Sequence, residues 1–445
     1  MNEETVKNEE CVDLPASDFE AAQGKAGKSG KKGKRGKKAL MVFIIILAVI
    51  VAFTGVTTCI TAIGLSSNLK KAQSFPAVET NELTLENYSN GCWNIYTDGE
   101  LKILQLTDVH LGGGWLSLNK DGMALNAVAA MISAEQPDLV IVTGDIAYPV
   151  PFQSGTFNNK SGAKLFATLM ETLGVYWTMT FGNHDTEAYS YYDREEITEF
   201  YSSGDYPHCL LQTGPSEVDG CGNQVINIVN SDGVITRSLI LIDSHSYIDS
   251  DKLGIQAKYD NIHDNQITWY KNTVAELNEK NEKTFATITA ERATAYAAEF
   301  STVPTSVFMH IPLAEYYDAW KEYEDNGYED TDNVTFNYGT YGEMVCYGVG
   351  EDEMFETMVE LGSTDTVFCG HDHYNNYSVT YKGIDLTYGM SVDYLAYFGI
   401  YKKGSQRGCT VITYSPDGSI SYEAQNYYQE KYSSYYEKET VEFDY

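Results

Sequence analysis

LKILQLTDVH, residues 101–110, combines a strand signal with two potential metal ligands. The apolar and β-favouring residues over Leu101–Thr107 are typical of a buried strand. Side chains two positions apart on extended chain point to the same face, so Asp108 and His110 can chelate one metal ion together. The stretch therefore predicts a strand that presents metal ligands just beyond its carboxyl end.

Four more blocks of the same form follow along the chain. In each, a short apolar run is followed by Asp, Asn or His, usually beside a glycine, which permits a tight turn and a close approach to an ion or phosphate. The blocks are Gly144-Asp145, Gly182-Asn183-His184-Asp185, His310 and Gly370-His371-Asp372-His373. Together with the first block they contain five of the eight histidines.

Imidazole, carboxylate and carboxamide groups form a ligand set for transition metals, and the blocks supply enough of them for two ions. The carboxylate of Asp145 has two oxygens and can bridge two cations, while Asn183 offers a neutral oxygen. Taken singly, an Asp at a strand end is most often a turn residue, and a lone His is more often structural than a ligand. Five such blocks in order indicate one common site. Enzymes commonly use two bound metal ions for the in-line attack of a nucleophile on the phosphorus of a phosphate ester.

Strand and helix patterns alternate from residue 101 onward, which predicts an α/β domain with buried strands and a site at their carboxyl ends. The apolar runs that indicate strands are 101–107, 138–143, 175–180, 225–229, 238–243, 306–310 and 366–369. Helices are predicted over about 121–135, 162–173 and 264–280, with Trp269 as core packing of the third.

The net charge is strongly acidic and unevenly distributed. The whole chain of 445 residues has a formal charge of −33, and residues 1–38 contain 9 Lys+Arg and 7 Asp+Glu. The remainder therefore has 21 basic and 56 acidic residues, a charge of −35. So acidic a surface repels nucleic acid and anionic lipid, and we expect no nucleic-acid partner. A solubilising surface on an exported protein explains most of this charge.

Residues 39–64 are uncharged and strongly apolar. Twenty-five residues of helix span about 38 Å, against about 30 Å for the hydrocarbon core of a bilayer. A cleavable signal peptide is the alternative, but its apolar region is normally only about 7–15 residues long. Eight basic residues between Lys25 and Lys38 precede the segment, so the positive-inside rule places the N-terminus in the cytoplasm. We therefore predict a single-pass cell-membrane protein whose folded domain is extracellular.

The predicted organisation has five parts. They are a basic disordered cytoplasmic segment (1–38), the transmembrane helix (39–64), a stalk (65–98), the folded domain (99–415) and a Tyr-rich acidic surface extension (416–445). None of the eight cysteines falls in a CxxC pair, so a structural zinc site is not expected. Cys209 and Cys221 are close enough in sequence to form a disulfide outside the cell, although the sequence leaves the pairing open.

The order of the blocks resembles the motif order D-x-H, G-D, G-N-H-[DE], H and G-H-x-H of the calcineurin-like metallophosphoesterase family. All five motifs are matched over about residues 101–400. Lys102-Ile103-Leu104-Gln105, residues 135–139 (EQPDL) and His310-Ile311-Pro312-Leu313 are similar to the purple-acid-phosphatase-like branch. The resemblance implies a four-layer αββα sandwich with the metals at the strand ends.

The resemblance also implies a division of the ligands between two divalent or trivalent ions of Fe, Mn or Zn. Asp108, His110, Asp145 and His373 would hold metal one, and Asp145, Asn183, His310 and His371 would hold metal two. His184 would donate a proton to the leaving oxygen or steady the phosphoryl group, with Asp185 orienting its ring. Two cations lower the pKa of a shared water and polarise the phosphoryl oxygens.

One departure from the purple acid phosphatases concerns Tyr148. Asp145-Ile146-Ala147-Tyr148 fits their G-D-x-x-Y pattern, in which the tyrosine binds iron, but those enzymes have Gly where this chain has His110. With His110 present, we interpret Tyr148 as a wall residue rather than a ligand. His245 follows another apolar strand and is more simply a surface-loop residue than a pocket residue, and we assign no role to His208 and His263.

These features predict a membrane-anchored extracellular metallophosphatase that hydrolyses small phosphate monoesters with a metal-activated water. An alternative enzyme is a phosphodiesterase acting on nucleotides or lipid-linked phosphates, because the same metal core serves both. A third hypothesis is that the protein is not an enzyme but a surface binding or adhesion protein with the same fold. The long acidic Tyr-rich regions would suit such a role. The sequence leaves the oligomeric state open.

Overall fold

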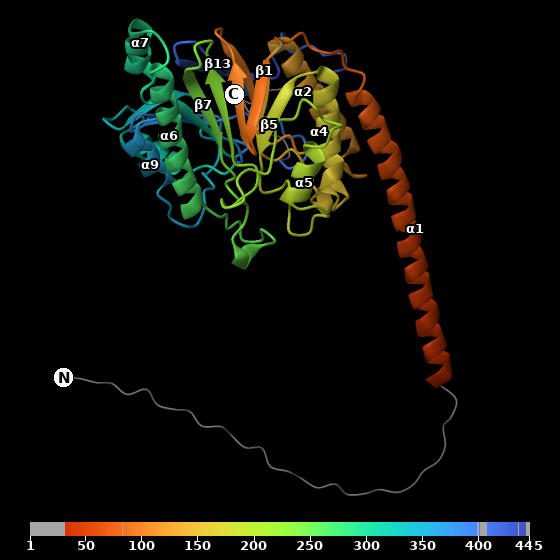
Figure 1. The fold of residues 1–445 in the computed structure, drawn as a ribbon. Coiled ribbons are helices and arrows are strands. Elements are labelled where there is room, and N and C mark those ends of the chain that lie inside the picture. Colours follow the sequence, from red (N-terminus) through yellow and green to blue (C-terminus); the bar gives the residue numbers. More distant parts are fainter. Residues whose placement is uncertain (1–31, 82, 398–399, 401–406, 435, 442–445) are drawn as a thin grey trace, which may run out of the picture. The chain divides into compact units, whose positions relative to one another are not determined.

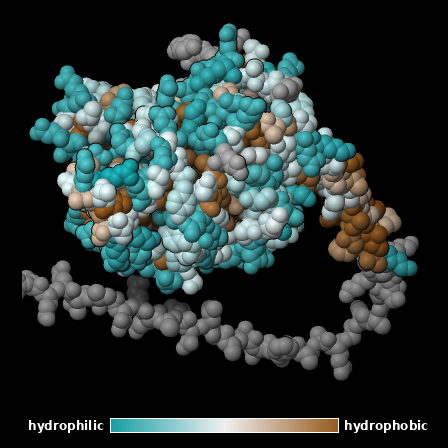
Figure 2. Space-filling view, turned by 45° about the horizontal axis from the view of Figure 1, so that its top comes forward, coloured by the Kyte–Doolittle hydropathy of each residue, from teal (hydrophilic) through white to brown (hydrophobic). Residues whose placement is uncertain are grey.

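The structure is a computed structural model that describes residues 32–81, 83–397, 400, 407–434 and 436–441. It divides into two compact units between Val56 and Thr57, inside helix α1 (Lys32–Ala72). Within α1, Lys37–Ala72 contains an 18-residue stretch with a mean hydropathy of 3.0, and the helix is long and apolar enough to cross a membrane. Apolar side chains cover its exposed surface in Figure 2. The predicted helix of membrane-spanning length is thus confirmed.

Of the predicted disordered segment, residues 1–31 lie outside the described residues, and residues 32–38 are the first turns of α1.

The smaller sheet has five strands in the order β14-β13-β3-β4-β5. Its strands are β3 (Leu101–Leu106), β4 (Leu139–Thr143), β5 (Tyr176–Thr180), β13 (Gly408–Tyr414) and β14 (Ile420–Asn426). The first three are parallel, and β13 pairs antiparallel with both β3 and β14. Three helices flank this sheet (Figure 1), namely α2 (Leu118–Glu135), α4 (Asn159–Leu173) and α5 (Arg194–Tyr201). The short α3 (Pro151–Ser154) lies between β4 and α4 in the chain.

The larger sheet has nine strands in the order β1-β2-β6-β7-β8-β10-β12-β11-β9. They are β1 (Thr84–Ser89), β2 (Cys92–Tyr96), β6 (Gln224–Val229), β7 (Ile235–Leu241), β8 (Thr305–Phe308), β9 (Val334–Tyr338), β10 (Thr364–Cys369), β11 (Ser378–Tyr381) and β12 (Ile384–Tyr388). The neighbours β7, β8, β10 and β12 are parallel. Helices α6 (Asp264–Phe285), α8 (Glu315–Asp325) and α9 (Met354–Leu361) pack on this sheet, and α7 (Ala290–Phe300) follows α6.

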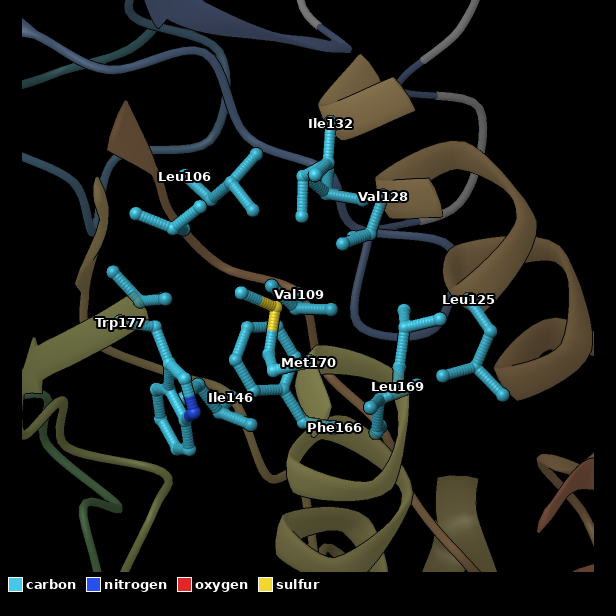
Figure 3. Close-up of a cluster of buried hydrophobic side chains, with 14 of the residues drawn as sticks. Leu106, Val109, Leu125, Val128, Ile132, Ile146, Phe166, Leu169, Met170 and Trp177 are labelled. Carbon is cyan, nitrogen blue, oxygen red and sulfur yellow. The ribbon is translucent and has the colours of Figure 1, made fainter. Parts of the chain in front are cut away.

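Alternation of side chains along the strands produces four layers. In β3, Leu104 and Leu106 face the helices of the smaller sheet, whereas Leu101 and Ile103 face the larger sheet. Figure 3 shows the first of these cores, in which Phe166 of α4 packs with Trp177 of β5. On the far side, residues such as Val307 of β8 pack against α6, α8 and α9. The molecule is therefore the predicted α/β sandwich, with two sheets between two helical layers.

Two predicted segments differ from the structure. We expected residues 65–98 to be a stalk, but α1 continues to Ala72, which is buried, and β1 and β2 are strands of the larger sheet. We expected residues 416–445 to be a surface extension, but β14 pairs with β13, and the rings of Tyr427 and Tyr432 are fully buried. Both segments belong to the domain. Cys209 and Cys221 are free thiols in this structure.

Candidate metal centre

The seven residues predicted to hold metals form one continuous buried cluster. Five pairs of ligand atoms lie close together, namely Asp108 Oδ1 with His373 Nε2 (3.3 Å), His110 Nε2 with Asp145 Oδ2 (3.1 Å), Asp145 Oδ2 with His310 Nε2 (3.3 Å), His310 Nε2 with Asn183 Oδ1 (3.1 Å) and His310 Nε2 with His371 Nδ1 (3.3 Å). The seven residues follow the carboxyl ends of five strands, β3, β4, β5, β8 and β10. Two of these strands, β3 and β10, are each followed by two predicted ligands. Chain segments more than 250 residues apart in sequence, such as those of Asp108 and His371, thus converge.

Backbone strain is concentrated at these ligands. Asp108, His110, Asp145 and His371 have φ of 51°, 51°, 58° and 76°, in the left-handed region that non-glycine residues rarely adopt. Each such residue costs of order 1–3 kcal/mol and persists only where the surrounding structure enforces it. Strain of this kind clusters at functional sites, so it supports a functional rather than a packing role for the cluster.

The motif glycines make room for the ligands. A Cβ atom on Gly182 would lie 2.1 Å from Asp145 Oδ1, and one on Gly144 would lie 2.3 Å from His310 Nδ1. These distances are far below van der Waals contact, so any side chain would displace the ligand beside it. The glycines are therefore required by the close approach of neighbouring strand ends.

The charge of the cluster fits cation binding. The buried Asp108 Oδ1 lies 3.3 Å from His373 Nε2, and within the described ranges neither Asp108 nor Asp145 is paired with a Lys or Arg. Burial opposes ionisation of Asp145, but His310 and His184 hold the pKa of its carboxyl well below the usual range. Two buried carboxylates without a Lys or Arg partner are costly unless cations are bound beside them, and carboxylate, imidazole and carboxamide donors suit Fe, Mn or Zn.

Asp393 is a buried carboxylate behind the cluster that the sequence analysis did not find. Its Oδ1 lies 3.2 Å from His110 Nδ1, and its Oδ2 lies 3.2 Å from His373 Nδ1. The backbone amides of Leu395, Ala396 and Tyr397 donate to the same carboxylate, which fixes it in place. Burial alone would lower the pKa of His110, but Asp393 and Asp145 raise it to about 9. Asp393 therefore orients two rings so that their Nε2 atoms face Asp145 and Asp108.

The ring of His184 is held by Glu187 rather than by Asp185. His184 Nδ1 donates to Glu187 Oε1 at 2.6 Å, and Glu187 is 6% exposed. Asp185 instead accepts the backbone amides of Asp145, Ala147 and Gly182. The expected contact of Asp185 with the ring is thus wrong: its carboxylate ties together the loops after β4 and β5. Glu187 was detectable in principle, since it lies only three residues after His184.

Comparison with known proteins agrees with this geometry. The sequence profile described as "Calcineurin-like phosphoesterase" matches residues 101–375, more than half of the chain. The chain belongs to the calcineurin-like phosphoesterase family. As a member it is a metal-dependent hydrolase of phosphoester bonds, and the family implies two metal ions.

Several relatives of this phosphoesterase are known. "Probable inactive purple acid phosphatase 14" of Arabidopsis thaliana is 28% identical over 75% of this chain and 80% of its own length. "Phosphatase DCR2" of Saccharomyces cerevisiae is 29% identical over 63% of this chain and 45% of its own length. A dimetal phosphatase from Danio rerio is 11% identical, with a TM-score of 0.43, and the match covers 74% of this chain and 99% of that chain.

Four tyrosines pack against the site of the phosphoesterase. The ring of Tyr148 lies 4.7 Å from those of both His110 and His184, and its hydroxyl donates to Gln153 at 2.6 Å. This position is that of a wall residue. Tyr259 lies 4.4 Å from the ring of His371, and Tyr397 lies 4.2 Å from that of His373. Tyr247 accepts the Asn183 amide at 2.9 Å, which turns the other amide atom, Oδ1, toward His310.

The remaining histidines lie apart from the ligand cluster. His245 Nε2 pairs with Gln266 Oε1 at 2.8 Å, and its ring stacks on that of His263 at 4.0 Å. His245 also borders a cavity of about 490 Å³ together with Glu187 and Tyr247. His208 pairs with Glu171. None of these three rings contacts one of the seven predicted ligands in the described part of the chain.

Proposed function

We propose that the chain is a membrane-anchored, dinuclear phosphatase that hydrolyses phosphate monoesters outside the cell. One observation carries the proposal, namely that seven motif residues from five strand ends form a single buried cluster with four strained ligands. A binding protein on this scaffold would have no reason to retain so costly an arrangement. The apolar stretch within α1 and the basic residues that precede this stretch motivate the anchor and its orientation.

The two ions would be divided as the family resemblance implies. Metal one would be held by Asp108, His110, Asp145 and His373, and metal two by Asp145, Asn183, His310 and His371. Ions of Fe, Mn or Zn suit these donors. When bound, they supply a water of lowered pKa and polarise the phosphoryl oxygens.

The chain's own residues complete the reaction. His184 is partly exposed, with its Nδ1 committed to Glu187, so Nε2 is the ring atom that would give a proton to the leaving oxygen. Asp185 acts through the backbone, because its carboxylate fixes the loops that present Asp145 and Asn183. His184 is thus the candidate catalytic acid, and Asp185 and Glu187 are positioning residues.

Metal analysis of the purified full-length chain tests the proposal together with hydrolysis of p-nitrophenyl phosphate. We expect two ions per chain and turnover. Asp145→Asn should lower turnover by at least about 10³-fold, because it weakens the shared ligand of both ions while the volume of the side chain is kept. Glu279→Gln, an exposed charge change on α6, is the matched control and should retain full activity.

The ester specificity needs a separate comparison. Bis(p-nitrophenyl) phosphate has the same leaving group as p-nitrophenyl phosphate, but its phosphate group has one negative charge fewer. The ratio of the two hydrolysis rates therefore measures the preference for a monoester or a diester. Faster turnover of the diester would show that the protein is a phosphodiesterase and not a phosphate monoesterase. Metal-free protein that stays inactive after Mn, Fe or Zn is added would instead favour a binding role.

A further inference from the structure

The most exposed apolar side chains of the domain gather on a few loops. Beyond α1, the large apolar side chains that are more than half exposed in the described residues are Phe152, Tyr191, Leu253, Ile255, Tyr328, Met344 and Val349. All but Tyr328 lie on four loops, which follow β4, β5, β7 and β9; the first of these loops includes the one-turn helix α3, on which Phe152 lies. Scattered single apolar residues are normal on a surface, but this concentration on one set of loops is not explained by chance exposure.

The same four loops build the walls of the metal centre. Phe152, 92% exposed, precedes Gln153, which holds the hydroxyl of Tyr148. Tyr191 ends the loop that carries His184 and Glu187.

The other two loops have the same construction. Leu253 and Ile255, the latter 81% exposed, lie at the tip of a loop whose base pairs Tyr247 with Tyr259. Met344 and Val349 lie on a loop tied to Asp372 through the Cys346 amide, and the Val349 amide donates to Tyr259. The first three loops thus carry or contact predicted ligands, and the fourth contacts Asp372, which lies between two of them in sequence; each loop also exposes an apolar side chain.

The C-terminal end of α1 belongs to the same compact unit as the domain, which comprises Thr57–Tyr445. The apolar run ends near Ile63, and Asn68 and Lys71 of the same helix already donate to the backbone of α2, at Leu118 and Gly122. Five residues of helix correspond to about 7.5 Å. Ala72 and the following Phe75 are buried in the domain core. A domain tethered to a helix that spans a bilayer meets that bilayer at a high effective concentration, so weak insertion of a few side chains is enough to dock on it.

We propose that these apolar loop residues dock on the bilayer that α1 spans, so that the phosphoesterase hydrolyses phosphate esters borne by membrane lipids. Phe152, Tyr191, Leu253, Ile255, Met344 and Val349 would form the docking rim. The inference rests on the proposed function, because it names the substrate class of the same site. The net charge of −35 beyond residue 38 repels anionic headgroups, so the rim needs a surface of zwitterionic lipid.

Docking is tested on the full-length chain in phosphatidylcholine vesicles, independently of catalysis. The Phe152→Trp variant should gain tryptophan fluorescence that brominated phosphatidylcholine quenches beyond the quenching of the wild type. The Tyr328→Trp variant is the matched control, since Tyr328 is 55% exposed but lies outside the four loops. Equal quenching in the two variants would overturn docking.

The substrate class is tested with two phosphate monoesters whose leaving oxygen is in both cases the primary alkoxide at the phosphate-bearing carbon of glycerol. Dioleoyl phosphatidic acid is presented by the bilayer, and glycerol 3-phosphate is dissolved. The double variant F152S/I255S should lower phosphate release from phosphatidic acid by about tenfold and change kcat/KM for glycerol 3-phosphate by less than about twofold. Tyr328→Ser should change neither rate.

The outcomes separate this inference from the proposed function. Equal losses on both esters, or no loss on either, would overturn the lipid substrate class while leaving a phosphatase. The same holds if the protein hydrolyses p-nitrophenyl phosphate but neither glycerol ester. Quenching at Phe152→Trp in a protein that hydrolyses no ester would support docking and reject the proposed function.

Discussion

The two halves of the metal centre are supported in different ways. In the half proposed for metal one, the rings of His110 and His373 share a buried carboxylate, that of Asp393. In the half proposed for metal two, neutral groups hold the ligands. Tyr247 accepts the Asn183 amide, and the Thr143 carbonyl accepts His310 Nδ1.

This difference concerns charge as well as orientation. A carboxylate behind a histidine raises the basicity of the ring, whereas a hydroxyl or carbonyl mainly fixes its direction. The first half would also have Asp108 as a ligand of its own, while the two halves would share Asp145. We therefore expect the first half to bind its ion more tightly and to favour the higher ionic charge. Supporting residues, and not only ligands, would set the order in which the two ions are lost.

Among the residues that support the ligands, the largest effect is predicted for a substitution of Asp393. Asp393→Asn keeps the shape of the side chain but removes the charge shared by His110 and His373. We expect the affinity for one ion per chain to fall by about 10–100-fold, the usual cost of losing such a partner. Equilibrium dialysis against buffered Mn²⁺ or Zn²⁺ measures this loss as one ion released while the other stays.

A matched control uses another carboxylate of the same chain segment. Asp385 on β12 accepts hydrogen bonds from Thr380 and Tyr422, away from the metal ligands. Asp385→Asn should retain both ions. Loss of both ions from Asp393→Asn, or of neither, would remove the distinction between the two halves.

A smaller effect is predicted for Glu187, which serves the leaving group rather than either ion. Glu187→Gln should keep both ions and lower kcat for glycerol 3-phosphate by about tenfold, since a poorly held acid transfers its proton less well. The loss should be smaller for p-nitrophenyl phosphate, whose good leaving group needs little protonation. Glu195→Gln, an exposed change on α5, is the control. An equal loss on the two esters would show that Glu187 only maintains the structure.

The clustering of the predicted ligands could be anticipated from sequence because their signals are local. Each follows an apolar run, and the carboxyl ends of neighbouring parallel strands must lie along one edge. The predicted strands and helices after residue 101 are confirmed for the same reason, since their periodicity is strong.

The residues missed by the sequence analysis have partners that are distant in sequence or carry a weak local signal. Asp393 lies in a loop, and its ring partners His110 and His373 are 283 and 20 residues away. β1, with the sequence TLENYS, is an exposed edge strand without an apolar face, so it looked like a stalk. The buried hydroxyl of Tyr432 donates to Glu135, 297 residues earlier, which no local pattern reveals. Tertiary contacts, rather than propensity, place these segments.

The smallest predicted effect concerns the second half of the centre. Tyr247→Phe removes the acceptor of the Asn183 amide and leaves the ring that stacks on Tyr259 at 5.3 Å. A hydrogen bond of this kind contributes about 1 kcal/mol, so the affinity for the more weakly held ion should fall by only about fivefold. Tyr148→Phe is the matched control, because its hydroxyl pairs with Gln153 and not with a predicted ligand. If Tyr247→Phe instead weakened one ion as much as Asp393→Asn does, neutral support would be as important as charged support. The two halves would then differ in composition but not in how firmly they hold a metal.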